Sequence, residues 1–130
     1  NFNRSFQDYK DGFGKFFTEM WLGLDKIHYL TKDLPYVLSS YVFDKNNTRY
    51  RSRQAGFRIG NESTGYKMTF EYSVNNRVND TLGDCLDELK GQPFSTYDKD
   101  NDNATGRNCA AEYHGGYWFN ACSSCNPTGE

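Results

Sequence analysis

The sequence lacks several features that would assign it to a common functional class. No apolar run approaches the ~20 residues that a membrane-spanning helix needs. The 130 residues carry a net charge of −2, so Lys and Arg provide no basic surface for nucleic acid. Internal repeats and low-complexity tracts are absent, and proline occurs only three times. We expect one domain that neither inserts into a membrane nor binds nucleic acid, in a chain whose start at Asn1 is typical of a processed or excised piece.

Aromatic side chains and four cysteines are the main resources for stability. Aromatics make up 17% of the residues and must supply much of the core, because the mean hydropathy is only −0.89. Four cysteines allow three disulfide pairings. Cys122 and Cys125 form a C-x-x-C pair, but thiol redox chemistry there would need a strand followed by a helix, and zinc binding would need a similar spacing around Cys85 and Cys109.

Five Asn-x-Ser/Thr sequons are also present, which together with an even number of cysteines favour a secreted glycoprotein. They begin at Asn3, Asn46, Asn61, Asn79 and Asn103.

Periodicity predicts two helices near the start of the chain. Residues 6–16 are expected to form a short helix broken by glycines, and residues 19–31 a longer one. In the longer helix His28 is interpreted as a packed residue rather than a ligand. The apolar side chains recur every three or four residues and are expected to face the core: Met20, Trp21, Leu24, Ile27 and Leu30.

Three strands are expected next, at residues 36–43, 50–59 and 66–72, the last with the clearest alternation. Residues 75–92 form a polar connection. From residue 93 the chain becomes loop-rich, apart from a short strand at 94–97. The fold class is therefore α+β, with an antiparallel sheet and short helices in residues 1–92 and a disulfide-stapled region in residues 93–130.

A cluster of carboxylates lies in the second region, where Asp98, Asp100 and Asp102 alternate along one loop. Such loops supply the oxygen ligands that Ca²⁺ prefers, although Asp and Asn are also ordinary turn residues. An EF-hand is excluded because Asn103 and Cys109 occupy the positions that require Gly and Glu.

Catalysis is not expected from these residues. The three carboxylates alternate on one loop instead of facing each other across a cleft, and the sequence places no nucleophile beside His114.

Four segments, in order, resemble the fibrinogen-like C-terminal domain family. Residues 12–14 with 19–31 are similar to its GFG…EFWLGNDKIHxLT segment, and residues 94–102 to FSTxDxDND. Residues 108–110 resemble NCA, and residues 115–122 resemble GxWWxxxC. The resemblance extends over nearly the whole chain and identifies it as a partial domain of this family, without the N-terminal subdomain and the last segment of a complete one.

The resemblance implies a calcium site and a disulfide. Asp100 and Asp102 would supply side-chain ligands and Ala104 and Gly106 carbonyl ligands, while Asp98 would orient the site without ligating. Cys109 would pair with Cys122. Because the segments around Cys85 and Cys125 lie near each other in the family fold, we predict a second disulfide between them, against the alternative of Cys122–Cys125 with Cys85–Cys109. We also predict that Asn103, inside the calcium loop, is unglycosylated.

The resemblance also implies a ligand pocket. In lectin members a cis peptide bond, here between Ala121 and Cys122, turns backbone N–H groups towards acetyl groups of sugars and other compounds. The residues expected at this pocket are Tyr113, His114, Trp118, Ala121, Cys122 and Ser123. Ser123 stands where the family usually has His, which affects the specificity for acetyl groups, and Arg107 is an extra residue after the calcium loop.

We therefore expect a secreted, calcium-dependent, lectin-like recognition domain of innate immunity, displayed in multiples in the full-length protein because linkage raises avidity. The alternative is a protein-binding module for adhesion, growth-factor-like signalling or clotting-type recognition.

Overall fold

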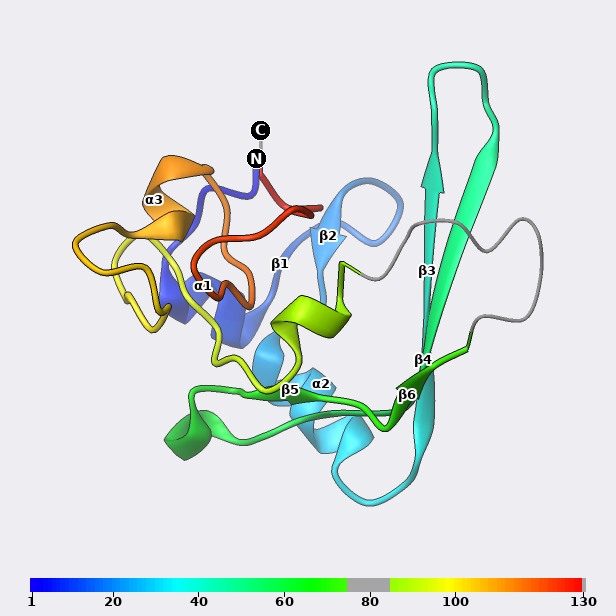
Figure 1. Ribbon diagram of the computed structural model, residues 1–130, viewed down its shortest axis with the longest axis horizontal. Helices are drawn as coiled ribbons and strands as arrows, with labels where there is room; N and C mark the ends of the chain where they lie inside the picture. The colour runs from blue at the N-terminus through cyan, green and yellow to red at the C-terminus, as the bar shows by residue number, and fades with distance from the viewer. Residues whose placement is uncertain (75–84, 130) are drawn as a thin grey trace.

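The computed structural model describes residues 1–74 and 85–129. Figure 1 shows two parts, a long ribbon of two strands on one side and a loop-rich body that carries the helices. None of the helices in the described residues is both long and apolar enough to cross a membrane.

The first helix, α1 (Phe6–Asp11), is shorter than the predicted 6–16 segment. It begins at a capping box, in which the Ser5 side chain accepts a hydrogen bond from the Asp8 N–H and Asp8 accepts one from the Ser5 N–H. It ends because Gly12 has a φ of 94°, and a Cβ there would lie 2.4 Å from the Leu22 carbonyl oxygen. The chain then enters a small hairpin of β1 (Phe13–Gly14) and β2 (Met20–Trp21).

The second helix, α2 (Leu24–Thr31), begins five residues later than predicted, because Met20 and Trp21 pair with β1 instead of joining the helix. The apolar stripe is correspondingly incomplete. Leu24 is buried, but Leu30 is 54% exposed. His28 is packed, as predicted: its Nδ1–H donates to the Ile59 carbonyl oxygen at 2.8 Å.

The sheet is antiparallel and centres on β4 (Arg49–Ile59), which pairs with β3 (Tyr36–Phe43) along its length. The predicted 66–72 strand is divided into β5 (Met68–Thr69) and β6 (Tyr72–Ser73), which pair with different parts of β4. The division falls opposite Gly56 and Phe57, which lie between the two paired parts of β4. Gly56, with a φ of 67°, is also the residue that the register of β3 with β4 skips. A short 3₁₀ turn, η1 (Glu62–Thr64), connects β4 to β5.

The core is largely aromatic, as the composition predicts. Tyr9, Tyr66, Phe94 and Phe119 are fully buried. The ring of Phe94 contacts those of Tyr9 and Trp118, both at 5.0 Å between centroids. These contacts join α1 to the loop-rich second half of the chain.

The second half has little regular structure. It contains η2 (Asp87–Leu89) and α3 (Cys109–Glu112), a short helix that the sequence pattern did not predict. The predicted strand at 94–97 is reduced to isolated bridges, in which Ser95 pairs with Tyr117 and Thr96 with Lys99.

Two disulfides staple this region, Cys85–Cys125 and Cys109–Cys122, with Cα–Cα distances of 5.8 and 5.4 Å. Both predicted pairings are therefore confirmed.

Candidate functional site

Asp98 lies at the start of the acidic loop and has a structural role. Its Oδ1 accepts hydrogen bonds from the Phe6 N–H at 2.9 Å and the Thr96 hydroxyl at 2.7 Å. Phe6 is the first residue of α1, so this carboxylate satisfies a free N–H at the start of that helix. The structure thus places Asp98 as a link between the loop and α1.

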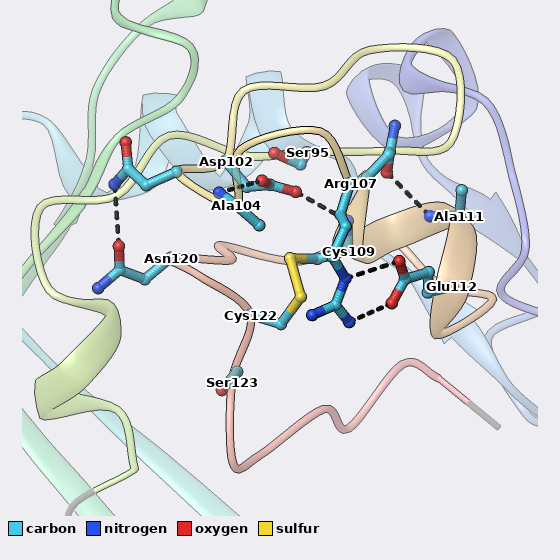
Figure 2. The surroundings of a disulfide bond; sticks show 12 residues. Ser95, Asp102, Ala104, Arg107, Cys109, Ala111, Glu112, Asn120, Cys122 and Ser123 are labelled. Carbon is cyan, nitrogen blue, oxygen red and sulfur yellow. Dashed lines mark hydrogen bonds and ion pairs between the residues drawn. A yellow bond between two sulfur atoms is a disulfide. The ribbon is translucent and has the colours of Figure 1, made fainter.

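Asp102 accepts hydrogen bonds at both of its carboxylate oxygens. Its Oδ1 accepts from the Ala104 N–H and its Oδ2 from the Cys109 N–H, both at 2.8 Å (Figure 2). Burial raises the pKa of Asp102, and the negative charge of neighbouring Asp100 acts in the same direction. The two N–H donors oppose this shift.

The donor set of this loop fits a hard cation. The described residues contain no cluster of three or more His, Cys, Asp or Glu side chains suited to a metal, so a cation here would depend on the two carboxylates together with backbone carbonyls. Asp100, Asp102 and the carbonyls of Ala104 and Gly106 supply oxygen alone, which is the chemistry of Ca²⁺ ligands. A cation would also stabilise the charged form of Asp102, whose pKa is raised mainly by burial and to a smaller extent by the negative charge of Asp100.

Two connections join this loop to the segment that follows Phe119. One is the Cys109–Cys122 disulfide. The other is a pair of amide side chains, in which Asn103 Nδ2 donates to Asn120 Oδ1 at 2.9 Å (Figure 2). A backbone hydrogen bond from the Asn103 N–H to the Asn120 carbonyl at 2.9 Å supports this pair. The position of the segment at 120–123 therefore depends on the acidic loop.

A hollow of about 510 Å³ lies beside this segment. Four of the six residues predicted for the ligand pocket line it. The lining consists of Glu88, Arg107, Tyr113, Asn120, Ala121, Cys122, Ser123 and Ser124.

The other two predicted pocket residues do not line this hollow. Trp118 is only 5% exposed, and its Nε1–H donates to the Tyr66 carbonyl at 2.8 Å, which makes it a core residue. His114 is exposed and adopts a left-handed backbone conformation with a φ of 53°.

Unpaired backbone donors are the most informative feature of the hollow. Within the described part of the chain, the N–H groups of Ala121, Cys122 and Ser123 donate to no acceptor. Backbone N–H groups that lie away from bulk water are nearly always paired, and Cys122 is only 8% exposed. The N–H of buried Cys122 is therefore the donor with most to gain from an acceptor atom of a ligand, whereas Ala121 is exposed and water can reach its N–H.

The predicted cis bond between Ala121 and Cys122 is wrong, since the described residues contain no cis peptide bond. A non-proline cis bond costs about 3–4 kcal/mol. The chain turns here without it, through a hydrogen bond from the Asn120 N–H to the Cys122 carbonyl at 3.2 Å.

Ser123, which stands in place of the family His, uses its hydroxyl within its own turn. Its Oγ donates to the Cys125 carbonyl at 2.8 Å and accepts from the Cys125 N–H at 3.0 Å. The hydroxyl proton is therefore already used, and a donor to a ligand must come from elsewhere.

Arg107 and Asn120 are residues of the hollow that sequence reasoning missed. Arg107 forms a two-point ion pair with Glu112 of α3, one arm of which is Nε to Oε1 at 2.9 Å (Figure 2). This pair lowers the pKa of Glu112 and raises that of Arg107. For Arg107, its position as an extra residue before Cys109 could have indicated a role at the site. For Asn120, no feature of the sequence indicates that it pairs with Asn103.

Tyr113 gives the hollow its aromatic wall. The side chain is half-buried and stacks on Phe119 with 6.0 Å between ring centroids and an angle of 21° between the planes. Phe119 is fully buried, so it fixes the orientation of the Tyr113 ring.

Of the predicted glycosylation sites, Asn3, Asn46 and Asn61 are exposed. Asn79 lies outside the described residues.

Known proteins share this architecture. The family model described as "Fibrinogen beta and gamma chains, C-terminal globular domain" matches residues 1–130. Human fibroleukin is 40% identical over 100% of this chain and 30% of its own length. Ryncolin-4 of Cerberus rynchops is 36% identical over 99% of this chain and 36% of its own length. The chain thus spans about a third of the length of these curated relatives.

Solved structures agree. The fibrinogen-like globe domain of human ANGPTL2 has a TM-score of 0.90 at 37% identity, covering 98% of this chain and 56% of that one. A lamprey fibrin D-dimer complexed with the peptide Gly-His-Arg-Pro-amide has a TM-score of 0.86 at 31% identity, covering 100% of this chain and 44% of that one. The chain belongs to the family of fibrinogen C-terminal globular domains.

Proposed function

We propose that this domain is an extracellular recognition module whose hollow beside Cys109–Cys122 binds an acetylated glycan or another acetylated compound. The observation that carries this proposal is the set of N–H groups without an acceptor in the described residues at 121–123, a segment that lines this hollow together with Tyr113. An acetamido group presents a carbonyl oxygen that accepts from such donors and a methyl group that packs on an aromatic ring. The proposed role is binding and not catalysis.

Polar side chains around the hollow suit the hydroxyl groups of a sugar. The Asn120 side chain accepts a hydrogen bond from Asn103 at its Oδ1, whereas its Nδ2 donates to no acceptor within the described residues. Arg107 also lies at the rim, and those of its guanidinium N–H groups that do not pair with Glu112 are further donors. Because the Ser123 hydroxyl is committed to Cys125, we expect the acetyl specificity to depend on the backbone and Tyr113 and not on residue 123.

We propose that Ca²⁺ supports this pocket from the loop side, held by Asp100, Asp102 and the carbonyls of Ala104 and Gly106. When bound, the ion would neutralise the two carboxylates and stiffen the loop. The Asn103–Asn120 pair and the Cys109–Cys122 disulfide connect that loop to the segment that lines the hollow. The ion would therefore act on ligand binding without contacting the ligand.

A second candidate function is peptide recognition, which Glu88 favours. Its carboxylate lies at the rim of the hollow, where it accepts a hydrogen bond from the Ser124 hydroxyl at 3.3 Å. The negative charge of this carboxylate suits a basic group of a peptide. The lamprey fibrin D-dimer with this fold is complexed with a peptide that contains Arg. A protein partner with an exposed basic end would use the same hollow.

A competition experiment separates the two candidates. The protein is passed over immobilised N-acetylglucosamine with CaCl₂ or EDTA, and eluted with N-acetylglucosamine, with glucosamine or with Gly-His-Arg-Pro-amide. Retention that requires calcium and is released by N-acetylglucosamine but not glucosamine supports acetyl recognition. Direct binding of the peptide without retention on the sugar supports the second candidate.

Two tyrosine variants provide the matched control. Tyr113→Ala removes the aromatic wall of the hollow and should reduce retention at least tenfold. Tyr97→Ala removes a ring that is 49% exposed and does not line the hollow, so retention should be unchanged. Equal retention of both variants would contradict binding in this hollow.

We also propose that the protein is secreted and displays several copies of this domain, since a single open hollow binds weakly and linkage multiplies affinity. The disulfides and exposed sequons support an oxidising, extracellular location. Analytical ultracentrifugation of the secreted full-length protein would test the assembly.

A further inference from the structure

A second hollow, of about 300 Å³, lies between α2, the end of β4 and the start of β5. In Figure 1 these elements occupy the lower part of the molecule, whereas α3 of the candidate site lies at the upper left. Three side chains in its lining are cationic, Lys32, Arg58 and Lys67, and none is acidic. In a chain with a net charge of −2, this concentration of positive charge is local.

Strand pairing explains why two of the cations meet. Arg58 pairs with Thr69 and Ile59 with Met68, and the Gly60 N–H donates to the Lys67 carbonyl at 2.9 Å. Since side chains alternate along each strand, Arg58, Lys67 and Thr69 lie on one face of the pair. The opposite face carries Ile59 and Met68, each only 1% exposed. Arg58 and Lys67 are thus diagonal neighbours on the exposed face, about 7–8 Å apart at Cα.

Helix α2 brings the third cation. His28 fixes the helix to β4 through its bond to the Ile59 carbonyl, and the Thr31 hydroxyl accepts from the Ile59 N–H at 3.2 Å. Lys32 follows His28 by one helical turn and so projects from the same side of the helix. Its ammonium lies 4.9 Å from the centre of the Tyr29 ring and 3.7 Å from an oxygen of Asp33.

These charges are not balanced within the hollow. In the described residues neither Arg58 nor Lys67 forms an ion pair. The Thr69 hydroxyl likewise has no hydrogen-bond partner there. Lys32 has Asp33 as a partner outside the lining, but Arg58 and Lys67 repel each other, and an anion between them would offset that repulsion.

We propose that this hollow binds a tetrahedral oxyanion, the sulfate or phosphate group of a ligand. The Arg58 guanidinium offers two parallel N–H donors to such a group, Lys32 and Lys67 offer point charges, and the Thr69 hydroxyl offers a further donor. The site is separate from the hollow beside Cys109–Cys122 and does not depend on calcium or on acetyl recognition.

The test is an NMR titration at low ionic strength with sodium sulfate and sodium phosphate, and sodium chloride as the ionic-strength control. The protein carries Asn61→Gln, because a glycan at this sequon beside Gly60 would crowd the opening. We expect saturable amide shifts at Gly60, Lys67 and Thr69 with sulfate or phosphate but not with chloride. Shifts that do not saturate, or that spread over all surface Lys and Arg, would overturn the proposal and leave nonspecific ion binding.

Matched double variants localise the effect. Arg58→Gln with Lys67→Gln should weaken sulfate binding at least tenfold. Arg49→Gln with Lys45→Gln removes the same charge from the exposed end of the β3–β4 hairpin. This control pair should change the affinity for sulfate less than twofold. Equal weakening by both pairs would show that only net charge matters, and the proposal would then be wrong.

A heparin-derived tetrasaccharide in the same titration identifies the source of the oxyanion. If the amide shifts saturate at a lower concentration of tetrasaccharide than of inorganic sulfate, the natural ligand is a sulfated glycan. Equal concentrations indicate a site for the free ion. Both results support the oxyanion site, whereas failure of all three probes to shift these amides refutes it.

Discussion

Replacement of Tyr9 by Phe tests how the two halves of the chain are held together. Tyr9 lies on α1 and is completely buried. Its hydroxyl donates to the Phe2 carbonyl at 2.6 Å and accepts from the Gly116 N–H at 3.0 Å. The substitution removes one oxygen atom and leaves the ring, so the aromatic packing against Phe94 is retained.

The expected loss of stability is about 2 kcal/mol. A buried N–H that loses its acceptor costs ~1–3 kcal/mol, whereas a net hydrogen bond contributes about 1 kcal/mol. Gly116 is buried and packed so closely that a Cβ there would lie 2.7 Å from the Tyr9 ring, which leaves little room for a water to replace the hydroxyl. The Phe2 carbonyl belongs to a half-buried residue, and water can replace the Tyr9 hydroxyl as its donor. The loss of this hydrogen bond therefore adds little to the destabilisation.

Urea denaturation at pH 7 measures the effect. A loss of about 2 kcal/mol moves the midpoint by roughly 1 M for a domain of this size. Tyr29→Phe is the control, since this ring is 71% exposed and its hydroxyl should matter by less than about 0.5 kcal/mol. If Tyr9→Phe were as stable as the control, the hydroxyl would not be the connection between α1 and Gly116.

Three further perturbations have defined outcomes. Burial raises the pKa of Tyr117 to about 12, so the free energy of unfolding that this shift contributes is fully present below pH 10 and is lost as the pH rises towards 12. Between pH 8 and pH 11 the wild-type protein should therefore lose about 1.4 kcal/mol of stability that Tyr117→Phe does not lose, as measured by urea denaturation. Replacing Cys85 and Cys125 by Ser opens a ring with a sequence separation of 40 and should cost about 4 kcal/mol in the chain-entropy model, measured by thermal denaturation; a loss below about 1 kcal/mol would contradict that model. Asn103 Nδ2 donates to two amide oxygens at 2.9 Å, so a glycopeptide map should show Asn103 unoccupied, and high occupancy would mean that this amide pair does not form.

Local sequence signals predicted the strands of the sheet well and the helices less well. Strand β3 has the predicted bounds, and β4 begins one residue before the predicted segment. The segment of β3 is rich in Val and aromatic residues, and turn residues separate it from β4. The helix predicted at 19–31 lost its first turn, because Met20 and Trp21 gain backbone partners in β1 that lie outside any local window. Periodicity reports which side chains share a face, but a competing strand decides where the helix begins.

The site shows the same division between local and distant information. The acidic loop and the four cysteines could be located from the sequence and its resemblance, and the disulfide pairings followed. The hydrogen bond of Asp98 to α1 could not be predicted from the sequence, because its partner Phe6 lies 92 residues away. Neither the Asn103–Asn120 pair nor the unpaired N–H groups at 121–123 leave a pattern in the sequence, since both depend on how the loop closes on itself.

These distant contacts explain why the acidic loop and the hollow lie side by side. The segment at 120–123 is held by a disulfide to Cys109 and by the Asn103–Asn120 pair, and both partners belong to the loop or its end. Asp102 accepts from the Cys109 N–H, and Cys109 is bonded to Cys122 in the wall of the hollow. One hydrogen bond and one disulfide thus connect Asp102 to the segment that carries the three N–H groups. If that connection carries a coupling free energy, linkage requires it to be the same in both directions, so an occupant of the hollow must stabilise a cation in the loop as much as the cation stabilises the occupant.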